Sequence, residues 1–490
     1  MLKSSLLEIL RTFSKQELIK FEDFVRSPYN NKVKNVVNLF AEIKKYAPEF
    51  SDENLEKEKV WTRLFPGKKY NYGIMKNIIY VLTGLSEKFI LLEEYSVNYL
   101  RCEIDLIEAA HSKNLPKFTS GKIDQLEKKI NIEIDPNKYS SINQFLAVAY
   151  KFFDMKSSFI HEYNLKQDRQ DFLSRSSDYL LFNFLVRSFK IIHNSSVNQA
   201  QVTRPVSSNF LEKFFLKLNE HSILEELFLN ENKFQDKPGK IVYCFYLMYK
   251  ALTSKGDKTE YVKFKTYLME NIDLFSAYEL QNLNSCRNTC AIFLNSSDEE
   301  VAREALEWYK FLEQKNILLL KNGLIHNSIM LTVVNYSIKL KETQYAEEFL
   351  NRYKDKLPAE SRDNTYNYCM AMIHFGKGEF GKSLECLSGI SDVDMIQKYL
   401  IKKLYLRIYY EMNDYESFIY AFDTFAHFKK RNKITSEPRS QAFNDFVNSI
   451  RSLFKLRNKY DKYEAIKLRK AAGDQIWFLE KLDDLEKLNN

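Results

Sequence analysis

The sequence predicts an all-α fold built from repeated helix pairs, and its composition is the first reason. The 490 residues include only 12 Gly and 9 Pro, well below average usage of about 7% and 5%. Sheets and tight hairpins need these residues at their turns, whereas helix interiors exclude them. Apolar residues make up 45% of the chain, with 37 Phe and 31 Tyr available to fill a core.

A regular spacing of aromatic residues is the second reason. Tyr345, Phe380 and Tyr415 follow one another at intervals of 35 residues, and each comes after a short polar hinge between two segments of helical periodicity. An interval of this length built from two helices is typical of helical-repeat proteins, which stack side by side into a solenoid.

Residues 1–112 are predicted to form a separate helical module. Ser14 and Glu17 have the spacing of a capping box, so a helix is expected to begin directly after Ser14. That helix should stop before Pro28, because proline disfavours the helical conformation in the residue before it. A long helix follows later in the module, and its predicted apolar stripe comprises Ile74, Ile78, Val81, Leu85, Phe89 and Leu92.

Residues 113–325 are predicted to continue as irregular helical hairpins. Long helices rich in aromatic residues are expected at 142–163 and 178–193. The stretch 195–209 (SSVNQAQVTRPVSSN) is polar, nearly uncharged and without periodicity. We therefore expect a loop or a module boundary there.

Residues 326–435 contain the 35-residue period. In the middle unit, Ala371 is the small residue of the first helix and Ser383 that of the second, while Gly378 and Phe380 fill the turn between them. With these residues the segment resembles the tetratricopeptide repeats, in three divergent units. The resemblance implies an α-solenoid in which small residues let paired helices approach, and the aromatic residue after each turn fills the gap between repeats. Larger residues stand at small-residue positions of the outer units: Tyr336, Leu406 and Phe418.

The same resemblance implies a binding surface on the exposed side of the first helices. In the second and third units this side comprises Tyr368, Met372, Phe375, Lys403, Arg407 and Tyr410. An aromatic strip beside two cations suits a peptide with apolar residues and a carboxylate. The Lys and Asn pair with which the family binds a terminal carboxylate is not matched, since Tyr368 and Met372 occupy those positions. Ordinary packing against the C-terminal helices is the alternative interpretation of this surface.

Residues 436–490 are predicted to be basic helices that cap the repeats. Between positions 427 and 470 the sequence has 13 Lys and Arg against four acidic residues, about +9, whereas the whole chain carries +8. Cations beside aromatic residues can bind nucleic acid, which is the alternative function. The candidate patch comprises Lys429, Lys430, Arg431, Lys433, Lys455, Arg457 and Lys459. Phe446, Ile450 and Leu453 have the spacing of a core stripe, so a solvated face is the competing interpretation, and an acidic protein or membrane surface is the third.

No constellation of residues predicts catalysis, a cofactor or a metal, so we expect a non-enzymatic protein. Residues 376–381 match G-x-G-x-x-G, but a dinucleotide site needs this motif between a strand and a helix. Here helical residues precede it, and a turn between helices is expected instead. Cys286 and Cys290 lie one helical turn apart without further ligands at suitable spacing, so we expect two core residues rather than a metal site.

The sequence predicts a cytoplasmic protein without a membrane span. Its six cysteines are sparse, which indicates reduced thiols. No run reaches the roughly 18 apolar residues of a transmembrane helix, and the apolar run at the N-terminus is too short for a signal peptide. The N-terminal part, with Phe21, Phe24 and residues 27–31 (SPYNN), resembles uncharacterised helical-repeat proteins of environmental bacteria, and this resemblance implies no activity. The expected function is that of a scaffold or adaptor which binds a protein or peptide partner in the groove of the repeats.

Overall fold

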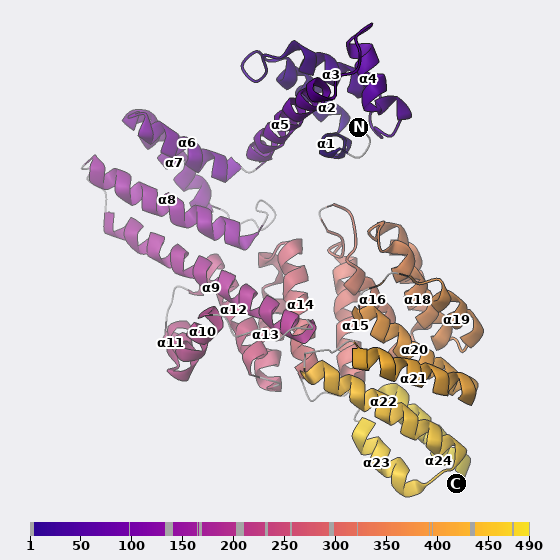
Figure 1. The fold of residues 1–490 in the computed structure, drawn as a ribbon. Coiled ribbons are helices and arrows are strands. Elements are labelled where there is room, and N and C mark those ends of the chain that lie inside the picture. The colour runs from indigo at the N-terminus through magenta and orange to yellow at the C-terminus, as the bar shows by residue number, and fades with distance from the viewer. Residues whose placement is uncertain are drawn as a thin grey trace. The chain divides into compact units, whose positions relative to one another are not determined.

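The computed structural model of the chain is all-helical in the residues that it describes (Figure 1). These are residues 4–97, 99–132, 141–163, 165, 169–201, 210–230, 234–254, 257–293, 298–320, 322–391, 393, 395–431, 437–472 and 475–489. Within these ranges the β pairing consists of one isolated bridge, between Leu319 and Ile325. The predicted all-α class is therefore confirmed. The chain divides into two compact units, Met1–Ile132 and Glu133–Asn490.

The described residues of unit 1 form seven α-helices and one short 3-10 helix, η1 (Glu53–Leu55). The α-helices are α1 (Ser5–Arg11), α2 (Lys15–Arg26), α3 (Lys34–Lys44), α4 (Lys57–Leu64), α5 (Tyr72–Val97), α6 (Tyr99–Ser112) and α7 (Pro116–Ile132). The capping box predicted for α2 is confirmed, because the Glu17 backbone N–H donates to Ser14 Oγ (3.2 Å) and the Ser14 N–H donates to Glu17 Oε2 (2.7 Å). Helix α7 packs against α6, and the division between the two compact units follows Ile132.

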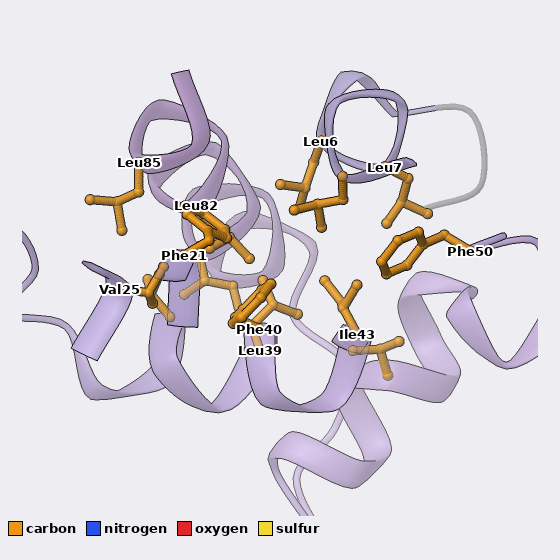
Figure 2. Packing of buried hydrophobic residues seen from close by; sticks show 14 of the residues in the cluster. Leu6, Leu7, Phe21, Val25, Leu39, Phe40, Ile43, Phe50, Leu82 and Leu85 are labelled. Atoms are coloured by element: carbon orange, nitrogen blue, oxygen red, sulfur yellow. The ribbon is translucent and has the colours of Figure 1, made fainter. Parts of the chain in front are cut away.

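The core of unit 1 lies among α1 to α5, around fully buried Phe21 (Figure 2). The Phe21 ring centroid is 4.9 Å from that of Phe40 and 5.3 Å from that of Phe89. The stripe predicted along α5 is correct only in its middle, where Ile78, Leu85 and Phe89 are buried, whereas its ends are 47% (Ile74) and 54% (Leu92) exposed. Helix α5 spans 26 residues, and these two residues at its ends are not covered by the other helices of the core.

The first half of unit 2 consists of the α-helices that precede residue 326. They are α8 (Ile142–Glu162), α9 (Arg169–Gln201), α10 (Phe210–Glu220), α11 (Ile223–Asn230), α12 (Lys237–Thr253), α13 (Lys258–Glu270), α14 (Ala277–Phe293) and α15 (Asp298–Gln314). The loop predicted at 195–209 is wrong in its first part, because α9 continues to Gln201. Residues 202–209 lie outside the described ranges.

In its described residues, the second half of unit 2 forms three helical hairpins followed by three further α-helices, with a short 3-10 helix, η5 (Lys354–Lys356), after the first hairpin. The α-helices are α16 (Asn327–Lys339), α17 (Thr343–Tyr353), α18 (Arg362–Gly376), α19 (Phe380–Ser388), α20 (Met395–Met412), α21 (Tyr415–Arg431), α22 (Glu437–Asn458), α23 (Lys462–Ala472) and α24 (Ile476–Asn489). Helix α16 packs against α17 and α18, and α18 packs against α19 and α20. The first two hairpins contact each other mainly through α16 and α18, whereas the third hairpin contacts the second mainly through α19 and α20.

The three hairpins share one turn geometry. Each turn has a residue with positive φ, namely Lys341 (62°), Gly378 (76°) and Asn413 (57°). The N–H of the next residue donates to a carbonyl one helical turn back, in the pairs Glu342–Ser337 (2.8 Å), Glu379–His374 (2.9 Å) and Asp414–Tyr409 (3.0 Å), as in a Schellman motif. Residues 376–381 thus form a turn between helices, as predicted.

The positions of the three periodic aromatic residues differ from the expectation. Phe380 and Tyr415 are each the first residue of a second helix, whereas α17 begins at Thr343, two residues before Tyr345. The Tyr345 hydroxyl donates to Glu313 Oε2 of α15 (2.9 Å), and the Phe380 ring is 5.9 Å from Phe375. Tyr415 is 54% exposed, and its ring centroid lies 5.5 Å from that of Phe454 on α22, so it packs at the surface and is not buried between helices as predicted.

Small residues allow close packing in the middle hairpin. Ser383 and Ala371 are fully buried, and Ser383 Oγ donates to the Ala371 carbonyl at 2.6 Å. At Gly376 an added Cβ would lie 2.9 Å from Ile338 Cδ1. Because that distance is shorter than real Cβ contacts, α18 could not pack this closely on α16 with a larger residue there unless Ile338 moved.

The C-terminal helices share one core with the third hairpin. This core comprises Tyr399, Leu406, Tyr410, Phe418, Phe425, Phe446, Ile450, Leu453, Phe454, Leu456, Ala465, Leu468, Ala472, Phe478, Leu482 and Leu485. It draws residues from each helix between α20 and α24. The core spacing predicted for Phe446, Ile450 and Leu453 is therefore confirmed.

Candidate functional site

A cavity of about 690 Å³ lies between the first helices of the three hairpins and α24. We call it the groove. Helix α16 contributes Thr332 and Asn335, the start of α19 contributes Phe380, and α24 contributes Trp477 and Lys481. Its size is in the range of about 300–1,000 Å³ that is usual for ligand pockets.

Five of the six residues predicted to bind a partner line the groove. They are Tyr368, Met372, Phe375, Lys403 and Arg407. They come together because α18 and α20 are neighbours and present one face each to the same space. Burial raises the pKa of Tyr368, so its phenol remains a neutral hydrogen-bonding group at neutral pH. Partner binding by these residues remains a prediction.

The sixth residue, Tyr410, is placed elsewhere. Its side chain is 2% exposed, and its ring centroid lies 5.5 Å from Phe454 and 5.4 Å from Trp477. The residue faces the core shared with α22 and α24 because it lies on the side of α20 that those helices cover. For Tyr410 the alternative interpretation from the sequence is therefore confirmed: this residue packs against the C-terminal helices.

Two cations of the groove lie over aromatic rings from the C-terminal helices. Lys403 Nζ is 4.4 Å from the Phe446 ring centroid. The Arg407 guanidinium carbon is 5.5 Å from the Phe446 ring and 5.1 Å from the Trp477 ring. Cation–π contacts of this kind hold a charged side chain in place without neutralising it.

Helix α24 forms one wall of the groove, which the sequence did not predict. Trp477 Nε1 donates to Glu411 Oε1 of α20 at 2.8 Å, and Lys481 Nζ lies 3.1 Å from the same carboxylate oxygen. Across the groove, Lys341 Nζ lies 2.9 Å from Glu480 Oε1. The sequence has no local signal for these contacts, because each joins residues more than 60 positions apart.

The groove has an excess of positive charge. Its lining includes five cationic side chains, Lys339, Lys341, Lys403, Arg407 and Lys481, and two acidic ones, Glu411 and Glu480. The balance is +3, and both carboxylates already face cations of the chain itself. Aromatic rings are the other main component of the lining, with Tyr336, Tyr368, Phe375, Phe380 and Trp477.

The basic patch predicted in the C-terminal segment is only partly described. The side chains of Lys429, Lys430 and Arg431, and the whole of Lys433, lie outside the described residues. Lys455 and Lys459 are exposed. Arg457 is used internally, because its Nη1 donates to the Tyr410 carbonyl and its guanidinium lies 5.0 Å from the Tyr410 ring.

The described residues include no group of three or more His, Cys, Asp and Glu side chains placed to hold a metal ion. Cys286 and Cys290 are 0% and 2% exposed, as expected for core residues. Among the described helices, none combines the length and apolarity needed to cross a membrane.

Comparison with known proteins leaves the groove to be interpreted from its own residues. No family model, no curated protein and no solved structure matches this chain.

Proposed function

We propose that this protein is a non-enzymatic scaffold or adaptor that binds a segment of a protein partner in the groove. In this proposal the three hairpins are divergent tetratricopeptide-like units of an α-solenoid, and α22 to α24 cap its C-terminal end. The repeated turn at Lys341, Gly378 and Asn413, and the packing of each hairpin against the next, support the repeat assignment.

The observation that carries the proposal is the composition of the groove. A cavity of about 690 Å³ places aromatic rings beside cations, and such a lining can bind apolar side chains and carboxylates at once. Five of the residues that the resemblance to the tetratricopeptide repeats implied, among them Phe375 and Lys403, line this one cavity. Peptide recognition by grooves between helices relies on this combination.

A bulky substitution inside the groove tests the proposal without removing core side chains. Asn335 lines the groove, so Asn335→Trp should fill part of the cavity and abolish partner binding. Asn351→Trp is the matched control, because Asn351 is exposed on α17 and does not line the cavity.

The assay uses the full-length tagged chain with chemical crosslinking and mass spectrometry in its native host. The expected result is a partner segment that crosslinks to groove residues in the wild type and in Asn351→Trp, and that is lost in Asn335→Trp. The same segment, made as a synthetic peptide, should bind the purified wild type. Equal crosslinking yields from both variants, with unchanged circular dichroism, would exclude the groove as the binding site.

We also propose that the protein acts in the cytoplasm, where its six cysteines, all free thiols in the structure, would stay reduced. The alternative function, nucleic-acid binding by the basic C-terminal segment, gains no support from Arg457, which contacts Tyr410. Nucleic-acid binding would predict that the affinity for an oligonucleotide falls steeply as the salt concentration rises, and a filter-binding titration measures this affinity.

A further inference from the structure

An ion pair joins opposite walls of the groove at Lys341 and Glu480. Lys341 belongs to the turn that follows α16, and Glu480 lies on α24, with 2.9 Å between Nζ and Oε1. The two side chains are 78% and 38% exposed. An exposed pair of this kind contributes about 0–1 kcal/mol. Another carboxylate could therefore replace Glu480 at Lys341 with little loss of stability.

Helix α24 itself is fixed, so the exchange would involve the Glu480 side chain and not the helix. Phe478 and Leu482 are fully buried in the core shared with α20 to α23. On the groove side, Glu411 accepts from the Trp477 indole and pairs with Lys481 at a site where both charged side chains are largely covered, 16% and 21% exposed. Helix α24 therefore stays in place when the exposed ion pair between Lys341 and Glu480 breaks.

The charge of the groove favours an acidic ligand. Of its seven charged side chains, five are cations, and the two acids face cations of the chain itself. A carboxylate placed at Lys341 would also lie in the field of Lys339 and Lys403, which line the same cavity. A basic segment would meet like charges there, which costs binding energy.

We infer that the partner segment is an acidic peptide, and that Glu480 occupies the position which a carboxylate of this peptide takes when it binds to Lys341. The inference rests on the proposed function of the groove and specifies its ligand. The aromatic lining, with Phe375, Phe380 and Trp477, adds that the peptide has an apolar side chain next to its acidic residues.

The proposal makes opposite predictions for the two members of the pair. Lys341→Gln removes the cation that the peptide needs, while it leaves an unbranched side chain at the positive φ of 62°, as in the wild type. It should weaken binding of an acidic peptide about two- to five-fold, the range that one exposed ion pair supports. Glu480→Gln removes the internal competitor and should strengthen binding by a similar factor. A purely structural role of the pair would make both variants bind more weakly.

The experiment measures fluorescence anisotropy of the full chain with three labelled twelve-residue peptides. The first alternates Glu and Leu around a central Phe, the second has Gln in place of each Glu, and the third has Lys. Glu299→Gln is the matched control for Glu480→Gln. It also breaks an exposed ion pair, with Arg303 on α15 (2.7 Å), and it changes the net charge by the same amount. We expect the Glu peptide to bind with the highest affinity and the Lys peptide with the lowest. Added salt should reduce the affinity for the Glu peptide.

The outcomes separate this inference from the proposed function. Binding of the Gln peptide as tightly as the Glu peptide, or an unchanged or weaker affinity in Glu480→Gln, would overturn the inference and leave a peptide-binding groove. No binding of any of the three peptides would count against the groove as a peptide site and remove both. A labelled oligo-dT of equal charge that binds more tightly than the Glu peptide, and loses affinity in Lys341→Gln, would also overturn the inference. If the chain associates with itself and Lys341→Gln abolishes this association, the inference is likewise overturned.

Discussion

Replacement of Tyr410 separates the two roles that the sequence and the structure give to this residue. A binding residue on an exposed surface could be changed to Ala with little loss of stability. The side chain is instead 2% exposed, between Phe454 at 5.5 Å and Trp477 at 5.4 Å. Removal of a buried aromatic side chain costs about 3–5 kcal/mol, so Tyr410→Ala should destabilise unit 2 by that amount.

Tyr410→Phe is the matched variant, because it keeps both ring contacts and removes only the hydroxyl. It should cost about 1 kcal/mol or less. The assay is urea unfolding of the full chain, followed by tryptophan fluorescence, to which Trp477 beside the Tyr410 ring contributes, and by far-UV circular dichroism. If Tyr410→Ala unfolds within about 0.5 kcal/mol of the wild type, the placement of this ring in the core is refuted, since surface substitutions have effects of that size.

Three further predictions concern other parts of the chain. Ser14→Ala removes the capping box of α2 and should lower the free energy of unfolding of unit 1 by about 1 kcal/mol, as measured by thermal denaturation. Gly378 has a φ of +76°, so Gly378→Ala should destabilise the α18–α19 hairpin by about 1–2 kcal/mol, and Gly378→Asn by less. Burial lowers the pKa of His193 from 6.5 to about 4, so between these pH values the unfolded chain binds a proton that the folded chain does not. Stability should fall as the pH is lowered through this window, by up to about 3 kcal/mol, and a His193→Gln variant should lose this part of the acid sensitivity in urea titrations at pH 7 and pH 4.5.

The features that sequence could predict are those set by neighbouring residues. The capping box at Ser14 and the turn at Gly378 were predicted because each depends on a few adjacent positions. The apolar stripe of α5 was predicted from helical periodicity, but periodicity does not say how far the covering helices extend, so the exposure of Ile74 and Leu92 was missed. The aromatic spacing gave the right number of hairpins, although Tyr345 does not occupy the position of Phe380.

The features that sequence missed depend on contacts between distant segments. Helices α22 and α24 cover one face of α20 and thereby bury it. Tyr410 lies on this covered face, in the core, whereas Arg407 lines the groove. The wall supplied by α24 required Trp477 to meet Glu411. Helical periodicity describes which residues share a face, but it does not determine which of two faces a later helix will cover.

The core shared by the third hairpin and the C-terminal helices has a consequence for any shortened form of this protein. Phe418 is 1% exposed, and its ring is 4.4 Å from that of Phe454 on α22. A stop codon or a protease cut after Arg431 would expose this ring together with Leu406 and Tyr410. The fragment would then carry an apolar surface where the full chain has a buried core. We expect such a fragment to aggregate, so removal of the last three helices should also destabilise the third hairpin, with which they share a core.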